Sequence, residues 1–192
     1  MKFLNLLFIP LILAGCSQRD ENSSYSEEFQ KYTGSYKIIS YMSDVAVDLN
    51  NDKILSNELV DEIYILKNNQ TFLDIIQNKS QNNIKLISMF LPKTHITYEY
   101  PSSPEGSVQD FSRYGFLSEL EFNPDTFHLM KNKYIENGTI DNIEYNKTVL
   151  IDKQIKIINS KHLQASVVKE YYDFSTKSWK ALNIKIIFEK MY

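Results

Sequence analysis

The sequence predicts an all-β protein whose strands pair antiparallel in a barrel or a sandwich. Between residues 31 and 192, short runs rich in Ile, Val, Tyr and Phe follow one another, and several alternate apolar with polar side chains. Asn, Asp, Gly, Pro and Ser separate these runs, and hardly any stretch has the helical period of about 3.6 residues. The pattern indicates roughly eight to ten strands with at most one or two short helices.

The expected strands follow in order along the chain. Most are short apolar runs that end at turn residues, and the last three are longer, with apolar side chains on one parity. In the final strand Ile184, Ile186 and Phe188 share one side, whereas Lys185 and Glu189 share the other. The strands are expected at residues 36–42, 63–66, 71–76, 84–91, 95–100, 118–122, 126–130, 148–158, 163–171 and 181–188.

Turn residues predict the connections between these strands. Residues 67–70 and 123–125 read as hairpin turns, and residues 137–138, Asn-Gly, read as a tight turn. Pro92 is expected to end its strand because proline cannot donate to a ladder. One short helix is expected at residues 56–62.

Composition limits the classes of function. The 192 residues suit one domain, and the hydrophobic fraction of 43% is enough for one core. The formal net charge is −3 and the basic residues form no cluster, so the sequence excludes nucleic-acid binding. The chain has one cysteine, which cannot form an intramolecular disulfide.

The first fifteen residues predict a secretion signal. Lys2 gives a positive start, and residues 3–13 form an apolar run about half as long as a membrane-spanning helix needs. The run ends in Leu13-Ala14-Gly15-Cys16, which resembles the lipobox of bacterial lipoproteins. The resemblance implies cleavage before Cys16 and acylation of its sulfur, and two or more acyl chains anchor a protein stably. The alternative is an ordinary signal followed by an unrelated cysteine.

A tether is expected between the anchor and the barrel. Residues 16–30 are polar and have no apolar period, which is typical of a flexible linker. Residues 17–21 resemble the acidic stretches that send lipoproteins of Bacteroidetes to the cell surface, although a plain solvated linker also fits. The predicted organisation is a signal peptide at 1–15, a lipidated cysteine and tether at 16–30, and a barrel domain at 31–192. The expected location is the cell envelope, at the outer membrane, facing the periplasm or the surface.

The start of the domain carries a family resemblance. Thr33-Gly34-Ser35-Tyr36-Lys37 resembles the Gly-x-Trp entry motif of lipocalins, with Tyr36 in the aromatic position. Residues 43–59 resemble lipocalin-like lipoproteins of Bacteroidetes, which often carry an acidic Asp-x-Asn-x-Asp-Gly segment after the first strand. The resemblance implies an up-and-down lipocalin-like β-barrel that Gly34 enters tightly and that the Tyr36 ring closes at one end. Two positions depart from the pattern, because Tyr36 replaces Trp and Lys53 replaces Gly.

The acidic segment after the first strand offers a candidate metal site. Asp48, Asn50 and Asp52 take positions one, three and five of an EF-hand-like calcium loop. Lys53 stands where the sharp turn needs Gly, and Leu59 stands where a bidentate acid is expected. Two interpretations remain: a calcium site, or a turn whose Asp and Asn side chains cap backbone N–H groups. No other cofactor is expected.

The sequence predicts no catalytic residues, so the protein is not expected to be an enzyme. His95, His128 and His162 fit no metal-binding spacing, and no nucleophile elbow, P-loop or dinucleotide motif is present. Glu119 and Glu121 lie two residues apart on one expected strand, where a solvated face explains them.

Tyrosine is the residue in excess, with thirteen in the chain. The pairs Tyr98/Tyr100 and Tyr171/Tyr172 could line a cup, form an interface or pack across strands. The expected function is a membrane-anchored lipocalin-like lipoprotein that binds a small apolar or amphipathic ligand, with ligand-binding residues unassigned. The alternative is a non-enzymatic interaction or accessory subunit of an envelope or surface complex, with a filled barrel.

Overall fold

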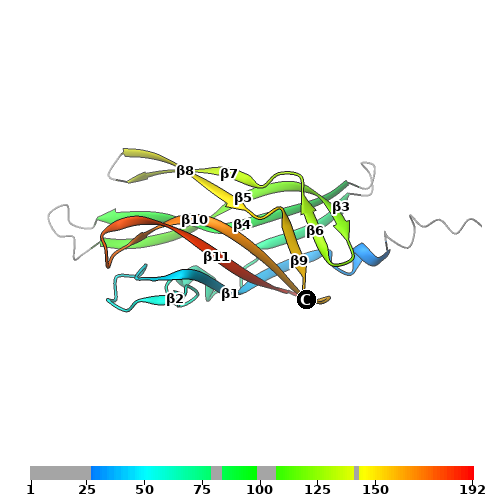
Figure 1. The fold of residues 1–192 in the computed structure, drawn as a ribbon, viewed down its shortest axis with the longest axis horizontal. Helices are drawn as coiled ribbons and strands as arrows, with labels where there is room; N and C mark the ends of the chain where they lie inside the picture. The colour runs from blue at the N-terminus through cyan, green and yellow to red at the C-terminus, as the bar shows by residue number, and fades with distance from the viewer. Residues whose placement is uncertain (1–26, 79–83, 99–106, 141–142) are drawn as a thin grey trace, which may run out of the picture.

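The computed structural model describes residues 27–78, 84–98, 107–140 and 143–192. They form one helical turn at 27–30, one 3₁₀ turn, η1 (Tyr64–Leu66), and a series of strands (Figure 1). The strands are β1 (Gly34–Val47), β2 (Ser56–Glu58), β3 (Leu73–Asn78), β4 (Ile84–Tyr98), β5 (Ser107–Asn123), β6 (Thr126–Leu129), β7 (Lys133–Ile140), β8 (Ile143–Ile151), β9 (Gln154–Ile157), β10 (His162–Asp173) and β11 (Ser178–Lys190).

The strands close into an antiparallel barrel. Neighbours run in the order β11-β1-β3-β4-β5-β6-β9-β10, and β10 pairs back with β11, which closes a barrel of eight strands. The β7–β8 hairpin joins the far part of β10, and β2 adds to β1. The predicted antiparallel up-and-down lipocalin-like barrel is confirmed.

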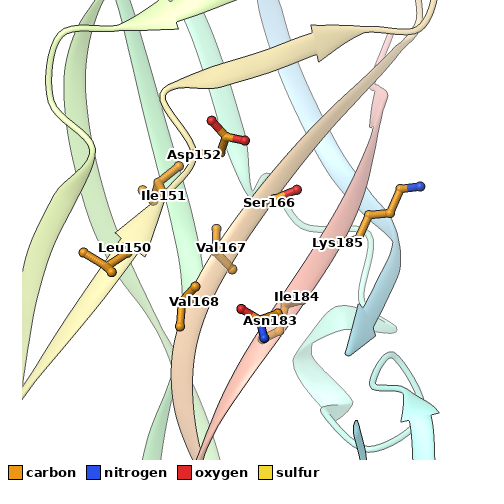
Figure 2. Close-up of a pocket in the computed structure, with 9 residues that line it drawn as sticks. All are labelled: Leu150, Ile151, Asp152, Ser166, Val167, Val168, Asn183, Ile184 and Lys185. Atoms are coloured by element: carbon orange, nitrogen blue, oxygen red, sulfur yellow. The ribbon is translucent and has the colours of Figure 1, made fainter. Parts of the chain in front are cut away.

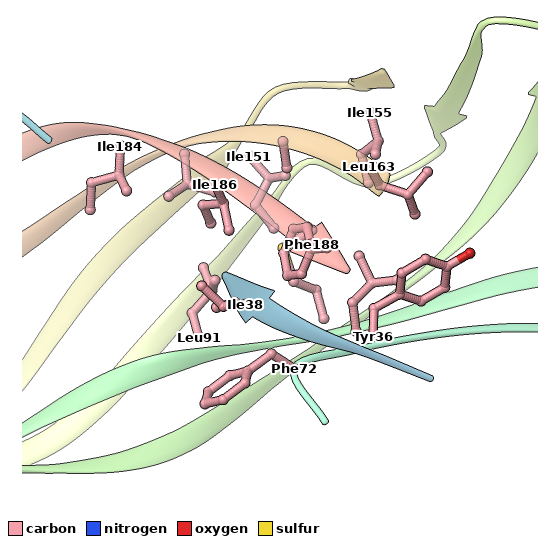
Figure 3. Packing of buried hydrophobic residues seen from close by; sticks show 14 of the residues in the cluster. Tyr36, Ile38, Phe72, Leu91, Ile151, Ile155, Leu163, Ile184, Ile186 and Phe188 are labelled. Carbon is pink, nitrogen blue, oxygen red and sulfur yellow. The ribbon is translucent and has the colours of Figure 1, made fainter. Parts of the chain in front are cut away.

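Period-two alternation places the core inside this barrel (Figure 3). On β10, Leu163, Ala165 and Val167 are buried, whereas the residues between them are more exposed. Ile186 and Ile184 of β11 pair with Ala165 and Val167, so the two strands present one continuous apolar face. Antiparallel pairing keeps directly opposed residues on the same face.

A bulge in β1 changes which parity points inward. Tyr36 and Ile38 are buried, the register with β11 then shifts between Ile38 and Ser40, and Tyr41 is buried next. The backbone N–H of Tyr41 donates to Glu58 Oε1 at 2.9 Å, so the bulged segment keeps its hydrogen bonds. β1 therefore places side chains in the barrel interior both before and after the bulge.

Aromatic rings close the barrel end at which β1 begins. Phe29 of the preceding helical turn lies 5.6 Å from the Phe122 ring and 6.0 Å from the Phe127 ring. The Tyr36 hydroxyl donates to the Tyr32 carbonyl oxygen at 2.6 Å. Because Phe29 is fully buried, the packed domain includes a residue of the predicted tether at 16–30.

Gly34 allows the chain to enter β1. Its φ of +130° is a conformation that residues with a Cβ rarely adopt, and a Cβ there would lie 3.2 Å from Lys190 Cε. Any other residue would strain this entry.

The helix expected at residues 56–62 is not formed, so that prediction was wrong. Ser56–Glu58 pairs with β1 as β2, and a turn follows in which Leu59 N–H donates to the Tyr41 carbonyl at 2.9 Å. The expected strand at 63–66 is instead η1, with Ile65 and Leu66 buried. A short apolar run in the sequence does not tell a buried turn from a strand, because apolar side chains are buried in both.

Pro92 does not end its strand, because β4 continues to Tyr98. The N–H of Phe90 donates to Phe72 O on the β3 side at 2.7 Å, and the pairing of β3 with β4 extends only to Met89. Pro92 follows Phe90 by two residues, so its missing N–H faces the side where β3 has already ended. A proline there removes no ladder hydrogen bond.

Two other expected boundaries also differ. Residues 137–138 lie inside β7, paired with β8, so they form no tight turn. The expected strand at 148–158 is divided into β8 and β9 at Asp152, whose N–H donates to Ser166 O of β10 at 2.8 Å. The β8 and β9 segments therefore pair with β10 one after the other, β8 at Val167–Val168 and β9 at Leu163–Gln164.

Candidate functional site

The inward side chains become polar toward the barrel end opposite the helical turn, here called the mouth. The carboxylate of Glu136 on β7 forms an ion pair with Lys169 on β10, and both side chains are at most 1% exposed. Burial lowers the pKa of Lys169, and the adjacent Glu136 counteracts part of that shift. Removing two charges from water costs about as much free energy as their attraction returns. The intact Glu136–Lys169 pair therefore adds little net stability to the fold.

Two tyrosines continue this polar cluster across the barrel. The hydroxyls of Tyr41 on β1 and Tyr171 on β10 lie 2.9 Å apart, and the Tyr171 hydroxyl donates to Pro92 O on β4 at 3.0 Å. Burial raises the pKa of both phenols, so both stay neutral at physiological pH. Three strands are thus joined by side-chain contacts through the interior.

Part of the hydrogen-bonding capacity of this cluster is unused. The Tyr134 hydroxyl and Glu136 Oε1 are buried, and neither has a hydrogen-bond partner within the described chain. The Tyr134 ring stacks on Tyr114 of β5 at 5.4 Å and lies 5.9 Å from the Phe116 ring. Buried polar groups are nearly always satisfied, so two orphans beside an aromatic wall point to a missing partner.

The wall of the barrel is interrupted beside these side chains. The pairing of β5 with β6 covers residues 120–123, and the N–H of Met130 donates to Glu119 O at 3.0 Å. Farther along, β7 pairs with β8 alone among the described strands and forms an edge of the sheet. Among the strands described, no backbone ladder joins β5 to β7 beside the Glu136–Lys169 pair, so side chains alone fill this part of the wall.

The predicted metal-site residues shape the loop between β1 and β2. Asp48 Oδ2 accepts from Lys53 N–H at 3.2 Å, Asn50 Oδ1 from Asp52 N–H at 3.0 Å, and Asp52 Oδ1 from Ile54 N–H at 2.8 Å. These bonds confirm the capping role that the sequence allowed. The Asn50 side-chain amide also donates to Asp52 Oδ2 at 3.0 Å, so both carboxylate oxygens of Asp52 accept hydrogen bonds within the loop, whereas Asp48 Oδ1 has no partner within the described chain.

The histidines and glutamates considered in the sequence do not come together in one site within the described chain. His128 lies on β6 and His162 on β10, where His162 contacts Glu189 at 3.6 Å, and the side chain of His95 lies outside the described set. Glu119 and Glu121 are exposed, as expected for a solvated face. Cys16, Tyr100 and the whole signal segment also lie outside the described residues.

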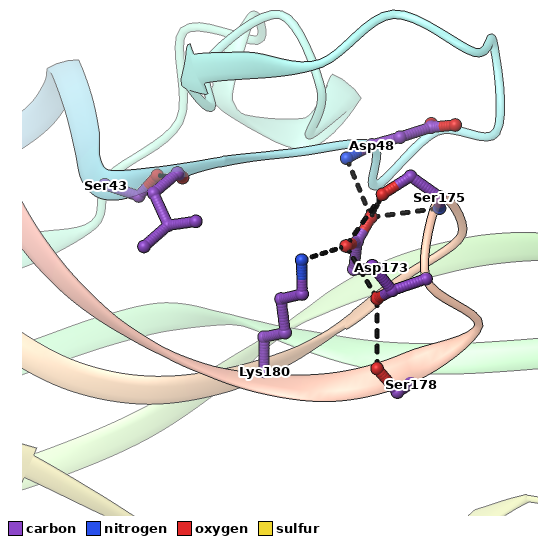
Figure 4. Close-up of polar contacts among 8 residues, drawn as sticks. Ser43, Asp48, Asp173, Ser175, Ser178 and Lys180 are labelled. Atoms are coloured by element: carbon purple, nitrogen blue, oxygen red, sulfur yellow. Dashed lines mark hydrogen bonds and ion pairs between the residues drawn. The ribbon is translucent and has the colours of Figure 1, made fainter.

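Sequence reasoning missed Asp173, which lies at the end of β10 and has no exposed side-chain area (Figure 4). Its carboxylate pairs with Lys180 Nζ at 2.6 Å, and it accepts hydrogen bonds from Ser175, from Thr176 and from the Asp48 N–H. Burial alone would raise the pKa of Asp173, but these partners outweigh burial and hold it well below its usual range. The Asp-x-Ser-Thr turn was the available signal, because Asp side chains often cap such turns.

The outer surface has a separate groove of about 380 Å³ between β8, β10 and β11 (Figure 2). It exists because β8 pairs with β10 at only two positions, 150 and 151, before the chain bends. Leu150 is 43% exposed, and Val168 lines the same hollow. This groove lies outside the barrel and shares no lining residue with the mouth cluster.

A scan against protein-family models finds no matching family, and searches of curated proteins and of solved structures find no match. Within the described residues, no helix is long and apolar enough to cross a membrane.

We predict that Lys169→Met will destabilise the fold by about 3 to 5 kcal/mol, because it leaves the Glu136 carboxylate buried and unpaired. Adding Glu136→Leu should restore stability to the wild-type level or above it, since no charge then remains buried. Urea unfolding followed by circular dichroism measures both effects. Lys37→Met, which breaks the half-exposed pair of Lys37 with Glu189, is the control and should cost less than about 1 kcal/mol.

We predict that Asp173→Asn will lower stability at pH 7 by about 2 to 4 kcal/mol, because Lys180 loses its buried partner. A carboxyl whose pKa is depressed in the folded state contributes above its unfolded pKa and loses that contribution as the pH falls. The difference from wild type should therefore shrink as unfolding is measured at pH values falling below about 4. Asp61→Asn, in an exposed pair, should change little. A pH-independent difference would contradict this account.

Proposed function

We propose that the protein is a lipid-anchored, lipocalin-like barrel of the cell envelope that binds a small apolar or amphipathic ligand at its mouth. In this proposal Cys16 carries the anchor in the outer membrane, and the protein acts by binding rather than by catalysis. The predicted signal and lipobox support the anchoring, and the barrel supports the binding.

One observation carries the choice of ligand class. The unpartnered Tyr134 hydroxyl and Glu136 Oε1 lie beside the rings of Tyr114 and Phe116. A ligand with an apolar body and a hydroxyl group would stack on the rings, donate to Glu136 Oε1 and accept from the Tyr134 hydroxyl. Ligand sites typically combine an apolar lining with a few fixed polar groups.

The position of the chain ends supports access from the aqueous side. The described chain starts beside the closed end, whereas the β10–β11 turn and the β7–β8 hairpin lie at the opposite end (Figure 1). Residues 16–26 would reach about 35 Å if fully extended. An anchor on this tether can therefore hold the closed end toward the membrane and leave the mouth free.

The rival function, an interaction or accessory subunit, rests on a different observation. The closed part of the barrel is filled by buried side chains, and the apolar groove at Leu150 and Val168 lies on the outside. Tyr145, Trp179 and Tyr172 add an aromatic cluster, with Tyr145 and Tyr172 each within 6 Å of the Trp179 ring. A protein partner would bind there without using the interior.

We predict that a small molecule will co-purify with the lipidated full chain when envelopes are extracted and the protein is moved into detergent-free peptidodiscs. Native mass spectrometry should detect it, and Tyr134→Phe should reduce occupancy about tenfold by removing one buried hydrogen bond. Because the Tyr134 hydroxyl has no partner within the described chain, this variant should fold as stably as wild type. Ile135→Ala, facing outward on the same strand, is the matched control. A stoichiometric protein partner with no small molecule would instead favour the rival function.

We also predict that Cys16→Ser will abolish acylation. Metabolic labelling with palmitate should mark the wild-type chain and leave the variant unlabelled, because the sulfur is the acceptor atom. A control substitution in the tether, Ser17→Ala, should label normally. Equal labelling of Cys16→Ser and wild type would refute the anchor.

A further inference from the structure

We propose that the loop between β1 and β2, together with Glu62, forms a calcium site. The ligands would be oxygens of Asp48, Asn50 and Asp52, the Ile54 carbonyl and the Glu62 carboxylate. This site is separate from the mouth and does not depend on the ligand proposed there.

Asp48 provides the main observation. Its side chain is fully buried, and Oδ1 has no hydrogen-bond partner within the described chain. The other oxygen of the same carboxylate accepts from the N–H of Lys53, so the group lies on the concave side of the turn. A buried carboxylate oxygen is too costly to leave without a donor or a cation.

The backbone at Lys53 makes the sharp turn that a calcium loop needs at its sixth position. Lys53, in the sixth position, has φ of +72°, which is the left-handed conformation that glycine usually supplies. Lys53 Nζ bonds to Asn51 Oδ1, and its ammonium group forms no ion pair with a described carboxylate. The replacement of Gly by Lys at this position therefore does not prevent the sharp turn of a calcium loop.

Glu62 takes the place of the missing acid at position twelve. Leu59 at that position is fully buried, whereas the Glu62 carboxylate accepts from the N–H groups of Leu49 and Asn50 at 2.9 and 3.3 Å. Glu62 is 4% exposed, so its charge is held against the loop.

The charges of the loop are not balanced by protein cations. Among the described residues, no lysine or arginine forms an ion pair with Asp48, Asp52 or Glu62. No group of three or more His, Cys, Asp or Glu side chains in the same part of the chain meets the requirements of a metal site by itself. In the proposed site the Asn50 amide oxygen and the Ile54 carbonyl would complete the coordination, because calcium also binds neutral oxygens.

The test uses the full lipidated chain in a non-ionic detergent after chelator treatment and dialysis. Isothermal titration with CaCl₂ should give a dissociation constant between about 10⁻⁵ and 10⁻³ M. Addition of 10 mM CaCl₂ should raise the melting temperature by about 5 °C or more at the tighter end of that range. Absence of both binding heat and a melting shift at 10 mM CaCl₂ would overturn the proposal.

Variants separate binding from folding. Asp48→Asn should abolish the calcium response, and Asp52→Asn, at an exposed side chain, should weaken binding at least tenfold even if Asp48→Asn fails to fold. Asp44→Asn is the matched control, because Asp44 is exposed, bonds to Asn183 and lies outside the loop. Wild-type affinity in both Asp48→Asn and Asp52→Asn, or an equal loss in Asp44→Asn, would show that calcium binds elsewhere.

Discussion

Closure of the sheet by β11 is the constraint on which the rest of the structure depends. This strand pairs with β10 from Asp173↔Ser178 to His162↔Glu189, and with β1 on its other side. Closing the sheet satisfies backbone groups that an open edge would expose. It also directs alternate side chains into one enclosed interior, so the period-two pattern becomes a core without any helix packed over it.

The inward face of β10 shows how this interior changes along the barrel. Leu163, Ala165 and Val167 are apolar, whereas Lys169, Tyr171 and Asp173 continue the same parity with polar groups. The apolar half is held by burial, which is nondirectional and roughly proportional to area. The polar half is held by specific pairs, and these contribute stability only while every partner is present. The mouth is therefore the part where one changed side chain has the largest local effect.

Strands with long, clean alternation were predictable, and long-range polar contacts were not. The pattern of β10 and β11 in the sequence is the pattern of burial in the barrel. Pro92 misled because its effect depends on where the neighbouring β3 ends. Glu62 fits no spacing motif. The Asp-x-Ser-Thr turn marks Asp173 as a capping residue, but no local pattern indicates that its carboxylate meets the Asp48 N–H across 125 residues of chain. The signal, the anchor and the envelope location remain predictions from the N-terminal residues alone.

The loop and the mouth are mechanically connected through Asp173. The N–H of Asp48 donates to Asp173 Oδ1, and the N–H of Phe174 donates back to the Asp48 carbonyl at 2.9 Å, so the β1–β2 loop and the β10–β11 turn hold each other. Tyr171 precedes Asp173 by two residues on the same inward face, and its hydroxyl joins the Tyr41 and Pro92 contacts of the mouth. A cation that orders the loop would reduce the freedom of this turn and hence of the tyrosines. Ordering part of a site in advance lowers the entropy cost of binding there. A calcium loop beside the mouth would thus make the mouth a better binding site without any direct contact between cation and ligand.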